Sequence, residues 1–137
     1  MQIRVFNEVD EPAVISLWKQ VFDHPEPRND PAAIIRRKLA AQRDLFFVAV
    51  VDGKVVGTVM GSYDGHRGWI YSLAVDAEYR RQKLGTALIR HVEKALAAQG
   101  SPKINLQVLS SNAGAIEFYE KLGYHVEERI SMGKVLE

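Results

Sequence analysis

The feature that most constrains the fold is the stretch of residues 45–75, where the hydrophobic pattern changes from helical to extended. The run LFFVAVV at 45–51 predicts a buried strand, and the pair Asp52-Gly53 predicts a hairpin turn. The returning strand is KVVGTVMGSY at 54–63, and a second turn at 64–68 leads into WIYSLAV at 69–75. Successive strands of this kind, flanked by helical segments, favour a sheet with helices on its faces.

The segment before this block predicts one strand and two helices. The strand is expected at 3–6, and Asp10 with Pro12 marks the start of the first helix. Asp30 caps the second helix, with Pro31 at its first position and with Ile35 and Leu39 on its inner face.

The segment after the block predicts a long helix, a strand and a short helix. Leucine or valine at 84, 88, 92 and 96 gives the long helix, which Gly100 ends. A strand follows at 103–108, then a helix capped at 111–112 and ended by Gly123, and two weak strands finish the chain. The predicted order is β-α-α-β-β-β-α-β-α-β-β. This is an α/β (α+β) fold with a mixed sheet of about seven strands flanked by four helices.

Length and composition limit the possible functions. A chain of 137 residues fits a single domain, which we place at 1–137. Eighteen Lys and Arg nearly cancel seventeen Asp and Glu, which argues against a nucleic-acid partner. The absence of cysteine excludes disulfides and thiolate nucleophiles, and the four histidines lack the spacing of metal ligands, so no metal is expected. The charged N-terminus and the short apolar runs lead us to expect no membrane partner and a cytoplasmic location.

The segment DAEYRRQKLGT at 76–86 carries the first candidate site. It joins the strand at 69–75 to the long helix, and the first backbone N–H groups of a helix have no partner within it. Arg80, Arg81 and Lys83 add positive charge there, and Thr86 adds a hydroxyl. Taken alone, these residues are more typical of an ordinary solvated helix start with an Arg/Lys run than of a diphosphate site. One observation favours the diphosphate site, because cations are unfavourable at a helix start unless an anion binds.

The segment NAGAIEFYEKLGY at 112–124 carries the second candidate site. Phe118 and Tyr119 share a helix face with packing residues, which is typical of core aromatics. The hydroxyl of Tyr119 needs a partner when buried, so this side chain is also a candidate acid.

Together the two segments resemble the GNAT superfamily of acetyl-CoA-dependent N-acetyltransferases, over essentially the whole chain. The loop of that family reads [Q/R]-x-x-G-x-[G/A], and its later helix reads N-x-x-A-x-x-F-Y-x-x-x-G-[F/Y]. The helix pattern is matched by Asn112, Ala115, Phe118, Tyr119, Gly123 and Tyr124. The stretch GTVMGSYDGHRG at 57–68 is similar to small bacterial acetyltransferases of the YpeA type.

Two registers fit the loop motif. In one, the motif begins at Gln82 and its first glycine is Gly85. In the other it begins at Arg80, and Lys83 stands where the family has its first glycine. The second register is preferred because it places Val75 and Tyr79 as the family does. Lysine then occupies a position where glycine would permit close approach of a ligand.

The resemblance implies direct transfer of an acetyl group from acetyl-CoA, a co-substrate, to a primary amine of a small molecule or peptide. The backbone amides of Leu73 and Val75 would hold the pantetheine arm and the acetyl carbonyl. Asn112 would line the coenzyme channel, and Tyr119 would protonate or hydrogen-bond the departing sulfur. The pyrophosphate would be held by Arg80, Arg81, Gln82, Lys83, Leu84, Gly85 and Thr86. The protein is expected to be a monomer or a homodimer.

The general base stays open at this stage. Many family members have a glutamate on the strand before the loop, but WIYSLAV contains no carboxylate. Tyr71, Asp64, His66 and a water molecule are the candidates. The alternative function is a catalytically silent acyl-CoA-binding or regulatory module. The missing carboxylate and Lys83 favour that alternative, and the intact helix motif at 112–124 disfavours it.

Overall fold

A five-stranded sheet forms the centre of the first of two units, Met1–Gln107, in the computed structural model, which describes residues 1–23, 26–80 and 82–136. The strands follow one another in the order β1-β2-β3-β4-β5, and the first four pair antiparallel. The last pairs parallel with its neighbour, so the predicted mixed sheet is confirmed. The strand bounds are β1 Gln2–Val5, β2 Phe46–Val51, β3 Lys54–Tyr63, β4 Gly68–Val75 and β5 Ile104–Leu106.

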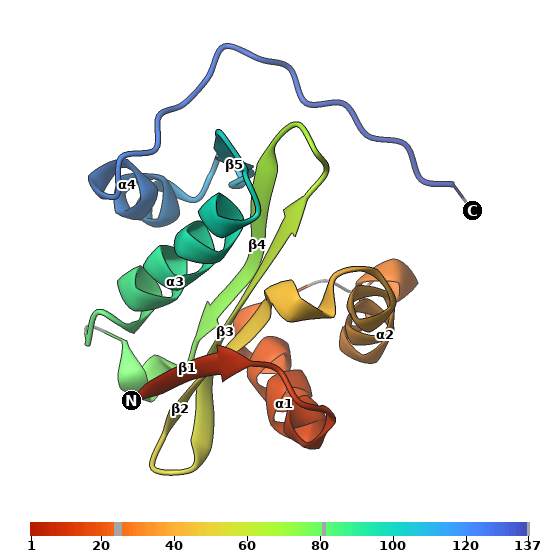
Figure 1. The fold of residues 1–137 in the computed structure, drawn as a ribbon, viewed down its shortest axis with the longest axis vertical. Coiled ribbons are helices and arrows are strands. Elements are labelled where there is room, and N and C mark those ends of the chain that lie inside the picture. Colours follow the sequence, from red (N-terminus) through yellow and green to blue (C-terminus); the bar gives the residue numbers. More distant parts are fainter. Residues whose placement is uncertain (24–25, 81, 137) are drawn as a thin grey trace. The chain divides into compact units, whose positions relative to one another are not determined.

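Helices cover both faces of this sheet (Figure 1). On one face lies α3, Leu84–Ala98, whose predicted apolar positions 84, 88, 92 and 96 are all buried. On the other face lies α1, Glu11–Val21, which packs on β3 and β4. The helix α2, Pro31–Ala41, packs against α1. None of the helices in the described residues is long and apolar enough to cross a membrane.

Glycines on β3 let α3 approach the sheet closely. A Cβ atom added at Gly61 would lie 2.7 Å from Cγ2 of Val92. A Cβ atom at Gly57 would lie 2.9 Å from Cδ1 of Leu88 and 3.2 Å from the carbonyl oxygen of Ala74. The two contacts under 3.0 Å are too short for carbon atoms, so a side chain at either glycine would force Val92 or Leu88 to shift.

The core on the α1 face is aromatic at its centre. The rings of Phe6 and Trp18 both stack with the ring of Phe46, with centroid separations of 4.4 and 5.9 Å. In α2, Ile35 is fully buried as predicted, and the second buried residue is Lys38. The prediction that Leu39 shares the inner face is confirmed, since Leu39 is half-buried and packs against this core.

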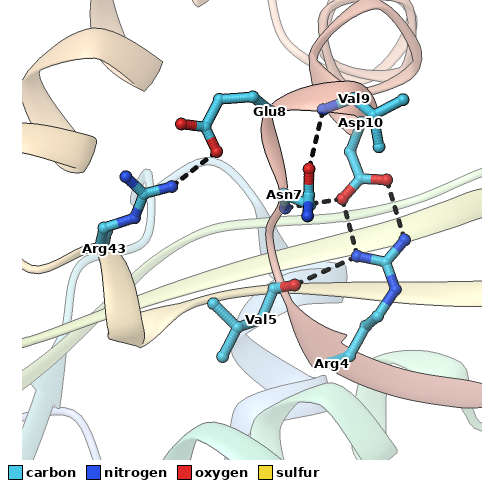
Figure 2. Close-up of polar contacts among 7 residues, drawn as sticks. All are labelled: Arg4, Val5, Asn7, Glu8, Val9, Asp10 and Arg43. Carbon is cyan, nitrogen blue, oxygen red and sulfur yellow. Dashed lines mark hydrogen bonds and ion pairs between the residues drawn. The ribbon is translucent and has the colours of Figure 1, made fainter.

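The start of α1 is fixed by a polar cluster (Figure 2). Asp10 is 5% exposed and accepts hydrogen bonds at 2.8 and 2.9 Å from both terminal nitrogens of Arg4. It also accepts one at 2.8 Å from the backbone N–H of Asn7. Arg4 and this N–H favour the ionised form, and they hold the pKa of the Asp10 carboxyl below its usual value against the effect of burial. The cluster ties β1 to the start of α1.

The second unit, Val108–Glu137, contains α4, Ala113–Lys121. The side chain of Asn112 caps this helix by accepting a hydrogen bond from the N–H of Ala115 at 3.1 Å, and Gly123 follows with a φ of +99°. The ring of Tyr119 packs against Phe118 and Tyr124, with centroids 5.0 and 5.8 Å away.

The two strands expected after Gly123 are not formed, and the sheet has five strands rather than about seven. Residues 124–136 carry no strand, and their apolar side chains at Val126, Ile130 and Met132 are at least 78% exposed. A strand is stable only when a neighbour takes up its backbone hydrogen bonds, and the charged run at 127–129 interrupts the apolar alternation that would direct one face inward.

Candidate functional site

An irregularity in β4 shapes the middle of the candidate site. The pairing of β3 with β4 shifts register between Thr58 and Met60, and Ser72 adopts a φ of +54°. The hydroxyl of Thr58 donates to the carbonyl of Ser72 at 3.0 Å, and it accepts from Nε1 of Trp18 at 2.8 Å. Thr58 is fully buried. These hydrogen bonds hold a β-bulge in place, a feature that bends a strand and redirects its backbone groups.

The edge of β4 opens beyond this point. Its parallel pairing with β5 covers only Gly68, Trp69 and Ile70. Leu73 and Val75 are half-buried and lie past the end of that pairing. Backbone groups at an unpaired strand edge are free to bind an extended ligand.

The loop after β4 is anchored at its beginning. The carboxylate of Asp76 accepts from the N–H of Glu78 at 2.9 Å and lies 3.7 Å from Nζ of Lys54. A short 3-10 turn, Ala77–Tyr79, follows. Arg80 is exposed and donates through Nε to the carbonyl of Val75 at 3.3 Å. The predicted site residue Arg81 lies outside the described residues.

Lys83 precedes α3 in a left-handed conformation, with φ of 60° and ψ of 22°. This conformation is favourable for glycine and costs about 1–2 kcal/mol for other residues. The geometry supports the register in which Lys83 takes the place of the first motif glycine. Among the described residues, the first turn of α3 has no acidic residue and no side-chain cap.

The backbone N–H groups at this helix start are therefore open to an anion. Leu84 is buried, Gly85 and Thr86 are half-buried, and Gln82 and Lys83 are exposed. The first N–H groups of a helix have no internal acceptor, and the helix dipole is positive there. A phosphate could therefore supply here the negative charge that acidic residues usually supply at a helix start.

Two predicted site residues, Asn112 and Tyr119, belong to the second unit. Asn112 is exposed, and its side-chain oxygen is already used in capping α4. Tyr119 is half-buried, and burial raises the pKa of its hydroxyl to about 12. The group is therefore a neutral hydrogen-bond donor throughout the physiological pH range.

The three side chains considered as general base have different surroundings. Asp64 accepts hydrogen bonds from the N–H groups of His66 and Arg67, both at 2.7 Å, and so closes the turn between β3 and β4. These bonds hold the pKa of its carboxyl below the usual value. Asp64 and His66 lie at the end of β4 opposite the loop, whereas Tyr71 lies next to the bulge. Nζ of Lys38 donates to the hydroxyl of Tyr71 at 2.8 Å.

A pocket of about 520 Å³ reaches the bulge from the side of α1 and α2. Trp18 and Phe22 give it aromatic walls, and Ile34 and Ser72 also line it. Its charged lining residues are Lys19, Asp23, Glu26 and Asp30. Acidic side chains thus outnumber basic ones, which favours a cationic ligand. Within the part of the chain that the structure describes, no group of three or more potential metal ligands is found.

The sequence model of the Acetyltransferase (GNAT) family matches residues 12–124. The chain is also 48% identical to Acetyltransferase ECA0875 of Pectobacterium atrosepticum over 136 residues, which is 99% of this chain and 96% of that protein. This chain belongs to the GNAT family of acetyltransferases. The resemblance read from the two motifs is confirmed.

Solved structures agree with this assignment. Ard1 from Thermoplasma volcanium has a TM-score of 0.81 at 28% identity, with 92% of this chain and 83% of that chain covered. The ribosomal-protein-S18-alanine N-acetyltransferase from Escherichia coli has a TM-score of 0.72 at 27% identity, covering 89% and 76%. The fold and the acetyltransferase activity thus follow from the family, and GNAT acetyltransferases use acetyl-CoA.

The sequence interpretation missed two features of this GNAT site. The first is the bulge at Ser72, because nothing in the sequence SLAV at 72–75 indicates a bulge. The second is the buried Lys38, for which a signal existed. Lys38 comes three residues after Ile35 and so shares its inward helix face, where a charged residue is unusual.

Proposed function

We propose that this chain transfers an acetyl group directly from acetyl-CoA to a primary amine. The observation that carries the proposal is the start of α3, with uncapped backbone N–H groups, no acidic residue and a lysine in the left-handed conformation. It follows the open edge of β4 along the chain, after the short turn Ala77–Tyr79 and the loop behind it. Along this path, the β4 edge can bind an extended chain and the helix start can bind a diphosphate. The pantetheine arm and the pyrophosphate of acetyl-CoA have this form.

We propose for the residues the roles that the family resemblance implies. The backbone amides of Leu73 and Val75 hold the pantetheine arm and the acetyl carbonyl. The loop from Arg80 through Arg81, Gln82, Lys83, Leu84 and Gly85 to Thr86 holds the pyrophosphate. Asn112 lines the coenzyme channel, and Tyr119 donates a hydrogen bond to the departing sulfur. The chain acts as one domain, 1–137, as a monomer or homodimer in the cytoplasm, with no metal, nucleic acid or membrane as partner.

The pocket on the α1 and α2 side supports an amine-bearing acceptor, because its lining carries three carboxyl groups and one ammonium. A GNAT relative of known structure is named for an alanine of ribosomal protein S18, so a peptide amine is one acceptor class to test. The small-molecule class is the other.

The test combines turnover with binding. Consumption of acetyl-CoA is measured against a panel of small amines, aminoglycosides and peptides, and turnover with at least one of them is expected. Reversal of Arg80 and Arg81 to glutamate is expected to weaken acetyl-CoA binding in calorimetry by about tenfold or more for each lost charge-assisted contact. An unchanged affinity in a folded double variant would remove the pyrophosphate assignment.

A further inference from the structure

Lys38 is a buried cation held by neutral groups. It is 5% exposed and extends from α2 toward the sheet. Its Nζ donates hydrogen bonds to the carbonyl of Gly61 and, at 2.8 Å, to the hydroxyl of Tyr71. The ammonium also lies 5.1 Å from the centroid of the Tyr71 ring. Lysine is rarely buried without an ionic partner, because removing its charge from water is costly.

The need to satisfy backbone groups at the sheet edge explains only part of the burial of Lys38. The pairing of β2 with β3 ends at Met60, so Gly61 and Tyr63 lie beyond it. Gln42, one turn after Lys38, exchanges two hydrogen bonds with the backbone of Tyr63 at 3.1 and 3.0 Å. A neutral amide is therefore sufficient to satisfy this edge, and an ammonium adds a desolvation cost that capping does not require.

Tyr71 connects this buried nitrogen to the surface. Its side chain is among the exposed ones, at 39%. It follows Ile70, where the pairing with β5 ends, and it precedes the bulge residue Ser72, which lines the pocket. Ile34, one turn before Lys38 on α2, lines the same pocket. Both elements that carry the pair thus reach the pocket that we assign to the acceptor.

We propose that Tyr71 and Lys38 together accept the proton that the acceptor ammonium must lose before it can attack acetyl-CoA. Tyr71 is the catalytic residue that meets the amine, and Lys38 is the positioning residue and final proton acceptor behind it. The inference rests on the proposed acetyltransferase function. It supplies the base for which β4 offers no carboxylate.

One proton moves from the acceptor ammonium to Lys38 by way of Tyr71. An N–H bond of the acceptor ammonium breaks, and its proton forms a new bond to Oη of Tyr71. The original hydroxyl proton of Tyr71 passes to the lone pair of neutral Lys38 across the 2.8 Å hydrogen bond. Lys38 becomes an ammonium, and the freed amine lone pair attacks the thioester. After turnover Lys38 returns the proton through Tyr71 to solvent, so the net reaction releases one proton.

The electrostatics of the pair agree with this order of events. Burial lowers the pKa of the Lys38 ammonium to about 8, and the carboxylate of Asp44, on the turn Arg43–Leu45, opposes part of that shift. A useful fraction of Lys38 is therefore neutral near physiological pH, and that fraction grows as the pH rises. Burial raises the pKa of Tyr71, against a hydrogen bond with Ser62. Tyr71 is thus no base on its own and must pass a proton on as it receives one.

Three variants separate this role from a structural one. Lys38→Arg keeps the charge and the hydrogen-bond donors, but arginine does not release a proton in proteins. Lys38→Met removes the nitrogen, and Tyr71→Phe removes only the hydroxyl. Arg36→Met is the matched control, because Arg36 is exposed on the same helix.

The experiment measures rate against pH with an acceptor from the panel, together with calorimetric affinity for coenzyme A and the melting temperature. The wild-type rate should rise through an apparent pKa near 8. The rate of each of the three variants should be lower by about 100-fold or more at pH 8, which is the lower end of the effect of an acid–base group. The pH dependence of the remaining rate should follow the ionisation of the acceptor itself. Arg36→Met should match wild type, and coenzyme A affinity should hold in all variants. A wild-type pH profile in a folded Lys38→Arg or Tyr71→Phe variant would overturn the proposal.

A second measurement needs no acceptor. Carbon NMR of ¹³Cε-lysine protein, with the Lys38 signal assigned from its loss in Lys38→Met, should show titration near pH 8. Tyr71→Phe should lower that pKa further, because the hydroxyl stabilises the ammonium. Titration of Lys38 above pH 10 would overturn the pair even if Lys38→Arg fails to fold. Absence of turnover with every amine would instead count against the proposed function.

Discussion

Thr58→Val tests whether one buried hydroxyl holds the bulge of β4. Valine matches the shape of threonine but has no hydroxyl, so Nε1 of Trp18 and the carbonyl of Ser72 both lose their partner. An unsatisfied buried group costs about 1–3 kcal/mol. The indole N–H bears the larger cost, because Trp18 is 2% exposed, whereas Ser72 is half-buried. We expect the free energy of unfolding to fall by about 3 kcal/mol.

The assay is unfolding followed by tryptophan fluorescence. Both tryptophans lie in the first unit, so their signal reports the part of the chain that contains the bulge. With an unfolding entropy of about 2.1 cal/mol/K per residue, a loss of about 3 kcal/mol in this chain lowers Tm by about 10 °C. Thr58→Ser is the control, because it keeps the hydroxyl and loses only a buried methyl, at about 1 kcal/mol.

The same variant tests the link between the bulge and the coenzyme path. Relaxation of the bulge would displace the backbone of Leu73, so acetyl-CoA affinity should fall about tenfold, the equivalent of one hydrogen bond. Thr58→Ser should bind as wild type does. A Thr58→Val protein within about 0.5 kcal/mol of wild type, the usual range of surface substitutions, would refute the reasoning.

Four further outcomes are expected. Gly61→Ala should lower stability by about 1–3 kcal/mol in urea unfolding because its Cβ overlaps Val92, and Gly61→Ala combined with Val92→Ala should recover part of the loss. Asp10→Asn should lower the free energy of unfolding by about 2 kcal/mol at pH 7. Because the folded-state pKa of Asp10 is lowered, its contribution to stability is present above about pH 4 and is lost as the pH falls further. The stabilities of the two proteins should therefore converge in acid unfolding. Lys83→Gly should leave the Tm equal or higher, since glycine relieves a φ of 60°, and a large loss of coenzyme affinity would show instead that the lysine side chain is a required ligand. Tyr119→Phe should lower kcat about 10- to 1000-fold with a smaller effect on KM for acetyl-CoA, and wild-type turnover would make Tyr119 a packing residue only.

Local signals predicted most of the first unit because its turns and caps are encoded by adjacent residues. Asp52 and Gly53 both adopt positive φ, as the hairpin prediction requires, and Asp30 caps α2 through the N–H of Ala33. The motif spacing allows two registers, and the left-handed conformation of Lys83 is consistent with the one that puts it in a glycine position.

Long-range contacts decided what the sequence could not predict. The bulge at Ser72 depends on a hydroxyl 14 residues away, and the burial of Lys38 depends on groups 23 and 33 residues away. Periodicity identifies the helix face on which Lys38 lies, but it does not identify the carbonyl and the hydroxyl that accept hydrogen bonds from its Nζ. The expected strands after Gly123 had only a weak apolar pattern, which the charged run at 127–129 interrupts, and pattern alone does not provide a neighbouring strand.

The glycines beneath α3 restrict which substitutions the chain can accept during evolution. Gly57 faces Leu84 and Leu88 in the first turns of α3, the same turns whose amides we assign to the pyrophosphate. A side chain at position 57 would crowd Leu84 and Leu88 and press on that end of the helix, so one substitution would reduce both the stability of the fold and the affinity for the ligand that we assign there. A smaller residue at 84 or 88 would relieve the contact with α3 but not the one at 3.2 Å with the backbone carbonyl of Ala74, so position 57 retains a cost even in such a pair.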